Sequence, residues 1–133
     1  MKYFTLKELC ASSVAEKNDI DNTPTEEAVE NLIALVEELM DPVREELDLP
    51  ICVSSGYRSN ELNKIVLGSK TSAHLRGAAI DCFCADNERL LKILKNQVFD
   101  QIIIHNGWLH VGYNSKSSGK KNRMQIIDKR KTI

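Results

Sequence analysis

Two apolar runs separated by a single Asn-Gly pair constrain the fold of this chain more than any other feature. Residues 101–105 read QIIIH and residues 108–113 read WLHVGY, with Asn106 and Gly107 between them. Asn-Gly flanked by such runs is the strongest short-range signal of a β-hairpin, and it predicts a type I′ turn. The chain therefore contains at least two adjacent antiparallel strands in its second half.

The register of this hairpin separates a core face from a polar face. A two-residue turn places His105 opposite Trp108 and Ile103 opposite His110. Because side chains alternate between the two faces of a strand, His105 and His110 project from the same face as diagonal neighbours, roughly 5–8 Å apart at Cβ. The opposite face carries only apolar side chains, from Ile102, Ile104, Leu109 and Val111.

Apolar periodicity and turn residues predict the remaining elements. We expect short helices over about 6–11 and 60–66, a helix over 86–96 that is capped by Asp86, and strands over 51–54, 78–83 and 124–127. A long amphipathic helix should begin with Thr23 as its cap, Pro24 at its first position and Glu26 closing a capping box. Pro42 should kink or split this helix near Asp41.

Strands and helices do not alternate regularly along the chain, and this pattern favours an α+β fold with helices packed on one side of a small antiparallel sheet. The 133 residues suit one domain, which we assign to residues 1–133. We expect a monomer.

Charge and hydropathy exclude two classes of partner. The formal net charge of -1 argues against nucleic acid, because phosphate binding favours a basic protein. No segment approaches the ~20 apolar residues that a membrane helix needs. The first eight residues, MKYFTLKE, lack the apolar stretch of a signal peptide. We therefore expect synthesis in the cytoplasm, with action elsewhere only after release.

The chain also contains four cysteines and a basic C-terminal segment. Cytosolic thiols are kept reduced, so we expect the four cysteines to be buried small side chains without disulfides. They are Cys10, Cys52, Cys82 and Cys84. The basic segment is interpreted as a solvated edge strand and terminus, or as a weak attractant for an anionic polymer such as a bacterial wall. It comprises Lys116, Lys120, Lys121, Arg123, Lys129, Arg130 and Lys131.

The third histidine lies in the segment SAHLRGAAID, residues 72–81. On the strand that ends this segment, Asp81 faces away from the apolar Ile80 and Cys82. A buried carboxylate without a partner costs several kcal/mol, so Asp81 requires a cation or hydrogen-bond donors. Two imidazoles and a carboxylate with one open position would suit catalytic zinc. Spacing alone leaves purely structural roles for His74 and Asp81 open.

The same segment resembles the S-x-H-x-x-G-x-A-x-D motif of the M15 zinc peptidases, which include D-Ala-D-Ala carboxypeptidases and phage endolysin peptidases. Residues 54–59, SSGYRS, resemble the family's upstream S-G-Y-R-S segment, and residues 108–111, WLHV, resemble its downstream Trp-x-His segment. The resemblance extends from about Phe4 to Tyr113. It implies a fold like that of the Hedgehog proteins and DD-peptidases, with one zinc ion held by His74, Asp81 and His110.

Two further roles follow from the resemblance. Arg58 corresponds to the family arginine that binds the terminal carboxylate of the substrate, a task that suits a planar guanidinium. His105 corresponds to a histidine that stabilises the transition state in the carboxypeptidase branch. Several branches place a glutamate base shortly before the last ligand, but residues 105–109 contain no acid, and Asp100 lies at the wrong end of its strand. His105 is therefore the best candidate for exchanging protons.

The resemblance implies zinc-dependent hydrolysis of a bacterial peptidoglycan stem peptide, with D-Ala-D-Ala carboxypeptidase activity favoured. Two alternatives use the same ligands: an endopeptidase of the endolysin type, and a non-catalytic module in which zinc is structural or the domain binds the wall. The missing glutamate favours the non-catalytic module, whereas Arg58 and His105 oppose it. A plain α+β domain without metal would require all three histidines to be ordinary core or surface residues.

Overall fold

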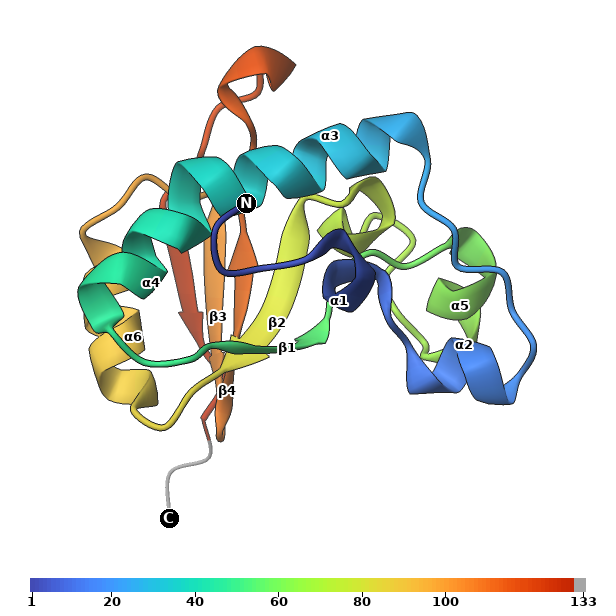
Figure 1. Cartoon of the computed structure of the whole chain (residues 1–133), viewed down its shortest axis with the longest axis horizontal. Helices are drawn as coiled ribbons and strands as arrows, with labels where there is room; N and C mark the ends of the chain where they lie inside the picture. Colours follow the sequence, from blue (N-terminus) through green and yellow to red (C-terminus); the bar gives the residue numbers. More distant parts are fainter. Residues whose placement is uncertain (131–133) are drawn as a thin grey trace.

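The predicted hairpin lies inside a five-stranded sheet in the computed structural model, which describes residues 1–130 (Figure 1). The sheet order is β1-β2-β4-β3-β5. Its strands are β1 (Cys52–Ser55), β2 (Ala79–Phe83), β3 (Gln101–His105), β4 (Trp108–Gly112) and β5 (Gln125–Asp128). All five strands lie within a few residues of their predicted positions.

The hairpin register is confirmed, but the predicted turn type is wrong. His105 pairs with Trp108 and Ile103 pairs with His110, as the two-residue loop requires. A type I′ turn needs positive φ at both central residues, whereas here Gly107 has a φ of 86° and Asn106 does not have a positive φ. A left-handed conformation costs Asn energy that Gly does not incur, and this turn uses it only at Gly107.

The sheet is mixed rather than wholly antiparallel, which corrects one part of the predicted fold. β1, β2, β4 and β3 pair antiparallel, but β5 pairs parallel with β3, with Gln101 opposite Gln125. The connection from β4 to β5 begins and ends at the same end of the sheet, and it passes β3 to reach the outer edge. β5 therefore runs antiparallel to β4 and parallel to the strand that lies between them.

Nine helical segments surround the sheet within residues 1–130. They are α1 (Leu6–Cys10), α2 (Ser13–Lys17), α3 (Glu26–Leu35), the π-helical turn η1 (Val36–Met40), α4 (Asp41–Leu47), α5 (Asn60–Ile65), the 3-10 turn η2 (Ala73–Arg76), α6 (Asn87–Lys95) and the 3-10 turn η3 (Lys116–Ser118). The predicted helices near residues 6–11, 60–66 and 86–96 are confirmed, including the cap by Asp86. The short helix α2 was not predicted.

The long helix begins two residues later than predicted. Thr25 is its cap and accepts a hydrogen bond from the backbone N–H of Ala28. The Thr23 hydroxyl instead donates to Asp21, at 2.6 Å. Because Asp21 occupies the Thr23 side chain in a local turn, the next Thr along the chain takes over the capping role.

Pro42 interrupts this helix without breaking it. α3, η1 and α4 follow one another directly, and Figure 1 shows them as one nearly continuous helix. Pro42 has no N–H to donate to the preceding turn, and the helix widens into a π-helical turn just before it, where the N–H of Asp41 reaches back to the carbonyl of Val36. The split predicted near Asp41 is thus a local change of helix type.

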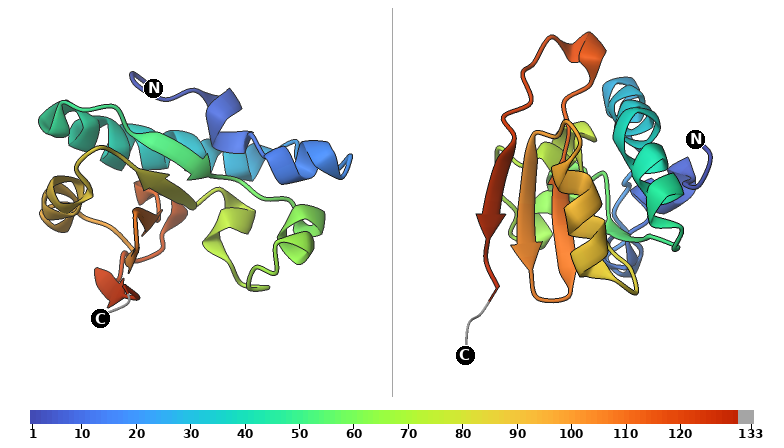
Figure 2. Two further views of the ribbon diagram at one scale, coloured as in Figure 1. Left: turned by 90° about the horizontal axis from the view of Figure 1, so that it is seen from below. Right: turned by 90° about the vertical axis from the view of Figure 1, so that its left-hand side faces the viewer.

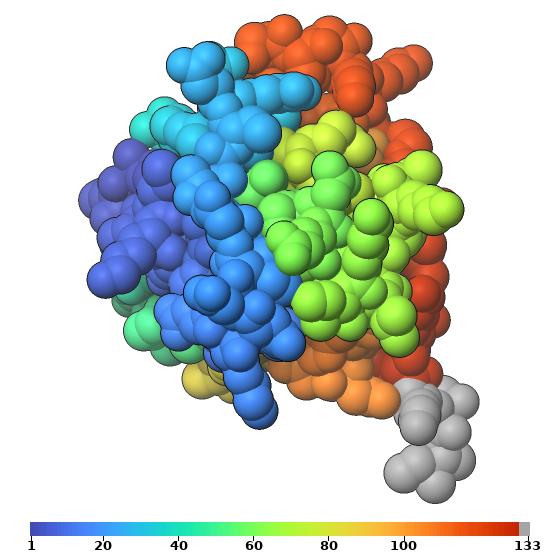
Figure 3. Space-filling view, turned by 90° about the vertical axis from the view of Figure 1, so that its right-hand side faces the viewer, coloured from blue at the N-terminus to red at the C-terminus, as the bar shows by residue number. Residues whose placement is uncertain are grey.

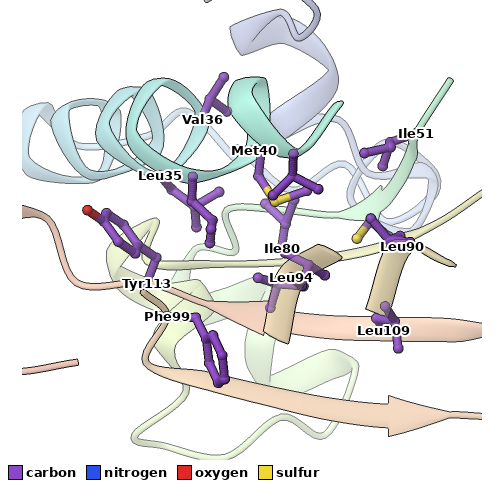
Figure 4. Close-up of a cluster of buried hydrophobic side chains, with 14 of the residues drawn as sticks. Leu35, Val36, Met40, Ile51, Ile80, Leu90, Leu94, Phe99, Leu109 and Tyr113 are labelled. Carbon is purple, nitrogen blue, oxygen red and sulfur yellow. The ribbon is translucent and has the colours of Figure 1, made fainter. Parts of the chain in front are cut away.

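The core lies between one face of the sheet and the layer formed by the long helix and α6 (Figures 2 and 4). The sheet contributes the predicted apolar face, in which Ile102, Ile104, Leu109 and Val111 are all buried. The helices contribute their apolar stripes, from Leu32, Leu35, Leu39, Met40, Val43, Leu47, Leu90 and Leu94. The α+β architecture with its main helices on one side of the sheet is confirmed, and the opposite face is left for polar residues.

Outside this core, α2 and α5, whose blue and green segments face the viewer in Figure 3, contribute to a small separate cluster made by the buried residues Ala15, Ile20 and Leu62. All four cysteines are free, and of these Cys82 is buried while Cys52 is exposed, contrary to the expectation of burial. Among residues 1–130, none of the helices is both long and apolar enough to cross a membrane. The basic residue Lys131 lies outside the described residues.

Candidate metal centre

Two neighbouring elements and one strand further along the chain bring two imidazoles and one carboxylate together. His74 lies on η2, Asp81 on β2 and His110 on β4, and Asp81 is directly opposite His110 in the β2–β4 pairing. Oδ1 of Asp81 lies 3.2 Å from Nε2 of His74 and 3.0 Å from Nδ1 of His110. The structure therefore brings together the three side chains that were predicted from the sequence. Their role as metal ligands stays a prediction.

His74 is held by the backbone around it. The Ser72 hydroxyl caps η2 by accepting a hydrogen bond from the backbone N–H of His74, and the carbonyl of His74 accepts from the N–H of Arg58 at 3.1 Å. The side chain is almost completely buried, with 1% of its surface exposed. The imidazole thus enters the site from a rigid, desolvated turn, which limits its loss of side-chain entropy on binding a ligand.

The position of the proton on His74 follows from its second nitrogen. Nδ1 lies 2.7 Å from the carbonyl oxygen of Gly56, and since a carbonyl only accepts, Nδ1 must carry a hydrogen. In the neutral imidazole, Nε2 then directs a lone pair at the Asp81 carboxylate. Two electron pairs that face each other at 3.2 Å require a positive charge, which either a metal ion or a second imidazole proton can supply.

The donor set fits a tetrahedral metal ion. One ligand atom from each of the three residues lies within 4.8 Å of the other two, and two ligands of one tetrahedral zinc ion lie about 3.3 Å apart. The hydrogen bond from His74 to the Gly56 carbonyl is the outer-shell contact that commonly orients a metal-bound imidazole. Three protein ligands leave a fourth position open, as catalytic zinc sites do.

The electrostatics of the trio favour an ionised carboxylate. Burial of Asp81 raises its pKa, but the adjacent imidazoles of His110 and His74 outweigh this effect and hold the pKa of Asp81 well below its usual value. The side chain remains 15% exposed. At neutral pH the site thus offers a negative charge to a cation without first releasing a proton from this group.

Two clefts border the trio at opposite ends of β4. The first, about 550 Å³, includes His110, Gly112 and Ser72 in its lining and is named here the His110 cleft. The second, about 390 Å³, is lined by Ser54, Asp81, Phe83, Gly107 and Trp108 and is named the Trp108 cleft. A substrate can therefore approach the trio from either direction along the polar face of the sheet.

Arg58 lies beside the trio, and its side chain forms no hydrogen bond with the three residues. Its backbone follows β1 and donates to His74. Its half-buried side chain has an Nε atom without a hydrogen-bond partner and forms no ion pair within residues 1–130. Burial lowers the pKa of Arg58 and the charge of Asp81 opposes this shift. Arg58 is thus an uncompensated cation near the site, and its binding role stays a prediction.

His105 shares the face of His110 but does not hydrogen-bond with the trio. Its ring stacks on Trp108, with ring centroids 3.7 Å apart and planes 6° from parallel. Burial lowers the pKa of His105, and Asp81 partly opposes that effect. The lowered pKa favours the neutral imidazole, which can accept a proton. Trp108 also lines the Trp108 cleft beside the trio.

One positioning residue, Asn22, was not predicted from the sequence. Asn22 donates its side-chain amide to the carbonyls of Cys10 and Tyr57, and its Oδ1 accepts from the N–H of Ser59 at 2.8 Å. It thereby joins α1 to the segment that carries Arg58. Asn22 lies in an irregular connection far from the motifs, and nothing in its local sequence indicates this contact.

Comparison with known proteins agrees with this geometry. None of the curated protein sequences compared with the chain matches it significantly. A family model described as peptidase M15 matches residues 2–112, which cover the sheet strands β1 to β4 and all three members of the trio. The chain therefore belongs to the peptidase M15 family.

Proposed function

We propose that this protein is a zinc-dependent hydrolase of a peptide bond in bacterial peptidoglycan stem peptides, with removal of a terminal D-Ala as the favoured reaction. Membership of the M15 family supports metallopeptidase activity. The single observation that carries the proposal is the arrangement of His74, Asp81 and His110, whose ligand atoms lie within 4.8 Å of one another while the Gly56 carbonyl holds the second nitrogen of His74.

His74, Asp81 and His110 would hold the zinc ion. When bound, zinc supplies Lewis-acid polarisation of the scissile carbonyl and acidifies a water molecule. The Gly56 carbonyl keeps the Nε2 lone pair of His74 free for the ion, and the ionised Asp81 lowers the net charge of the loaded site.

Arg58 and His105 would act on the substrate. The guanidinium of Arg58 has no ion pair among the described residues and suits a bidentate bond to the terminal carboxylate of a peptide. The lowered pKa of His105 favours its neutral form, and its stacking on Trp108 fixes the plane of its ring. It would take up or return a proton as the tetrahedral centre forms and collapses.

A second candidate is an endopeptidase that cuts within the stem peptide. The observation in its favour is that clefts flank the trio at both ends of β4. Such an arrangement accommodates substrate residues on both sides of the scissile bond, whereas cleavage of a single terminal residue needs space mainly on one side.

The test combines metal analysis with a substrate panel. We expect one zinc ion per chain in the wild-type protein and almost none in His74→Ala or Asp81→Ala. The Arg58→Ala protein should keep its zinc but lose at least about tenfold in kcat/KM on a peptide ending in D-Ala-D-Ala, the effect of about 1.4 kcal/mol of lost binding. Arg89→Ala, on the distant helix α6, is the matched control.

The panel includes an internal stem-peptide bond beside the terminal one. Preference for the internal bond, with no effect of Arg58→Ala, would select the endopeptidase. Absence of zinc from the wild-type protein after dialysis against excess zinc would end the proposal.

A further inference from the structure

The His110 cleft carries an excess of positive charge. Its lining contains four basic side chains, from Arg76, Lys120, Lys121 and Arg123, and one acidic side chain, from Asp100. These groups come from η2, from the end of the β4–β5 connection and from the start of β3, so only the folded chain brings them together. The cleft also contains His110 of the metal site.

The one acid in this lining is already paired. Arg123 donates to Asp100 through Nε at 3.0 Å, through a terminal nitrogen at 2.8 Å and through its backbone N–H at 3.1 Å. Asp100 and Arg123 therefore neutralise each other. Arg76, Lys120 and Lys121 remain, and none of them forms an ion pair in the described part of the chain.

The connection that carries the lysines is tied at its base. Asn114 and Asn122 exchange two hydrogen bonds, of 2.8 and 3.0 Å, and the side chain of Asn114 donates to the carbonyl of Lys121. Next to this clamp, the Arg123–Asp100 pair anchors the chain to the start of β3. The connection projects beyond the end of the sheet (Figure 2, right), and its last residues return to the cleft in a defined position.

Arg76 is placed in the same way by its backbone. Its carbonyl accepts a hydrogen bond from the side chain of Asn31 on α3, at 2.8 Å, and it belongs to the same turn as His74. Glu27 and Glu30 line an adjacent, smaller hollow that shares Arg76 and Lys120, but neither carboxylate pairs with them in the part of the chain that the structure describes. Lys121 lines the His110 cleft and not that hollow.

The opposite side of the trio is apolar. Phe83 and Trp108 dominate the Trp108 cleft, and Asp81 is its only charged lining residue. The His110 cleft is therefore basic and the Trp108 cleft is mainly apolar. A substrate that lies along β4 has its negative charges next to basic side chains in only one of its two orientations.

We propose that the His110 cleft binds a carboxylate-bearing segment of the substrate peptide through Arg76, Lys120 and Lys121, and so sets which side of the scissile bond carries the acidic residues. This inference rests on the proposed peptidase function of the same site. Guanidinium and ammonium groups form strong charge-assisted hydrogen bonds with carboxylates, and a cleft lined with one sign of charge also speeds the encounter with an anionic ligand.

The test measures binding apart from turnover. Two fluorescein-labelled peptides of equal length, one with two Glu residues and one with two Gln residues in their place, are titrated with the full chain by anisotropy at low salt. The Glu peptide should bind at least about tenfold more tightly, a difference of about 1.4 kcal/mol. The variants Lys121→Gln and Arg76→Gln should each lower that preference several-fold, whereas Lys92→Gln, an exposed lysine on α6, should not.

Each outcome has one meaning. Equal affinity for the two peptides, or an equal loss in the Lys92→Gln protein, overturns the cleft assignment even if zinc-dependent hydrolysis is observed. Selective binding of the Glu peptide by a protein that hydrolyses no peptide supports the cleft and contradicts the proposed function. Because Lys121 is exposed, the Lys121→Gln protein should fold normally. It therefore decides the test if the Arg76→Gln protein misfolds. Stronger competition by a poly(glycerol phosphate) chain than by unlabelled Glu peptide overturns the assignment in favour of a phosphate polymer.

Discussion

The imidazole of His74 is oriented by a backbone carbonyl, that of Gly56, and its backbone N–H is held by the hydroxyl of Ser72 in the same motif. The neighbouring Gly77 ends η2 with a φ of 70°, and a Cβ built on it would lie 2.4 Å from the carbonyl oxygen of Ala28 on α3. The glycine of the motif thus allows η2 to pack against the long helix. At the residue scale, the candidate metal centre depends on the positive φ of Gly77 and on the close approach of Gly77 to the backbone of Ala28.

Comparing Gly77→Ala with Gly119→Ala separates these two effects. Gly119 has nearly the same φ, 71°, but a Cβ there would meet nothing within 4 Å. We expect Gly119→Ala to lower the free energy of unfolding by about 1–2 kcal/mol, the cost of a left-handed residue with a Cβ. Gly77→Ala should cost at least about 2 kcal/mol more, because backbone must move. Urea unfolding followed by circular dichroism measures both, and equal losses would contradict the role of the Ala28 contact.

At the scale of elements, one ion pair, between Arg123 and Asp100, fastens the end of the β4–β5 connection to the start of β3. The hydrogen bonds from the Arg123 side chain are the main reason that the pKa of Asp100 lies below its usual value, and burial of the carboxylate opposes them. The Asp100 side chain is 11% exposed, whereas that of Arg123 is 58% exposed. Solvent around Arg123 screens the pair, so its contribution to stability is modest.

The contribution of this pair should depend on pH in a defined direction. Because the folded pKa of Asp100 is lowered, the pair stabilises the fold fully above the unfolded value of about 3.9 and progressively less as pH falls through the folded value. Arg123→Gln should therefore cost about 1 kcal/mol at pH 7 and less at pH 3. Urea unfolding at both pH values measures this.

Arg130→Gln removes an ion pair with Asp128 whose partners are both about half exposed, and it serves as the control with little expected effect at pH 7. A loss for Arg123→Gln that is the same at pH 3 and pH 7 would contradict the ion-pair argument.

At the scale of the whole molecule, the trio connects η2 to two strands in the middle of the sheet order. η2 also packs on α3, so these contacts join the main structural layers around one point. A ligand that binds only where these segments converge stabilises the folded state by mass action. The candidate metal centre should therefore be measurable as thermal stability.

Zinc at 100 times its dissociation constant should stabilise the chelator-treated protein by about 2.7 kcal/mol. For a chain of this size that corresponds to a rise in Tm of roughly 8–10 °C. The Asp81→Asn protein lacks the anionic ligand and should show a much smaller rise. Differential scanning calorimetry with and without zinc measures both proteins, and equal shifts would show that zinc binds elsewhere.

Local chemistry made much of this protein predictable. A two-residue turn allows one register, and strands alternate with a period of two, so the pairing of Ile103 with His110 and the division into an apolar and a polar face follow from residues 101–113 alone. The choice of His74, Asp81 and His110 followed from a motif of ten residues and one histidine in the hairpin, and the structure places them together.

The features that were missed or wrongly predicted depend on partners distant in sequence or on competition between neighbours. The parallel pairing of β5 depends on where the preceding connection returns to the sheet, and the start of α3 depends on Asp21 taking the Thr23 hydroxyl. The bridge made by Asn22 and the excess charge of the His110 cleft arise only when separate segments meet. Short-range periodicity thus determined which face of the sheet carries the candidate site. Tertiary contacts alone decided which residues surround that site, because hydrogen-bond partners and local net charge depend on which segments become neighbours.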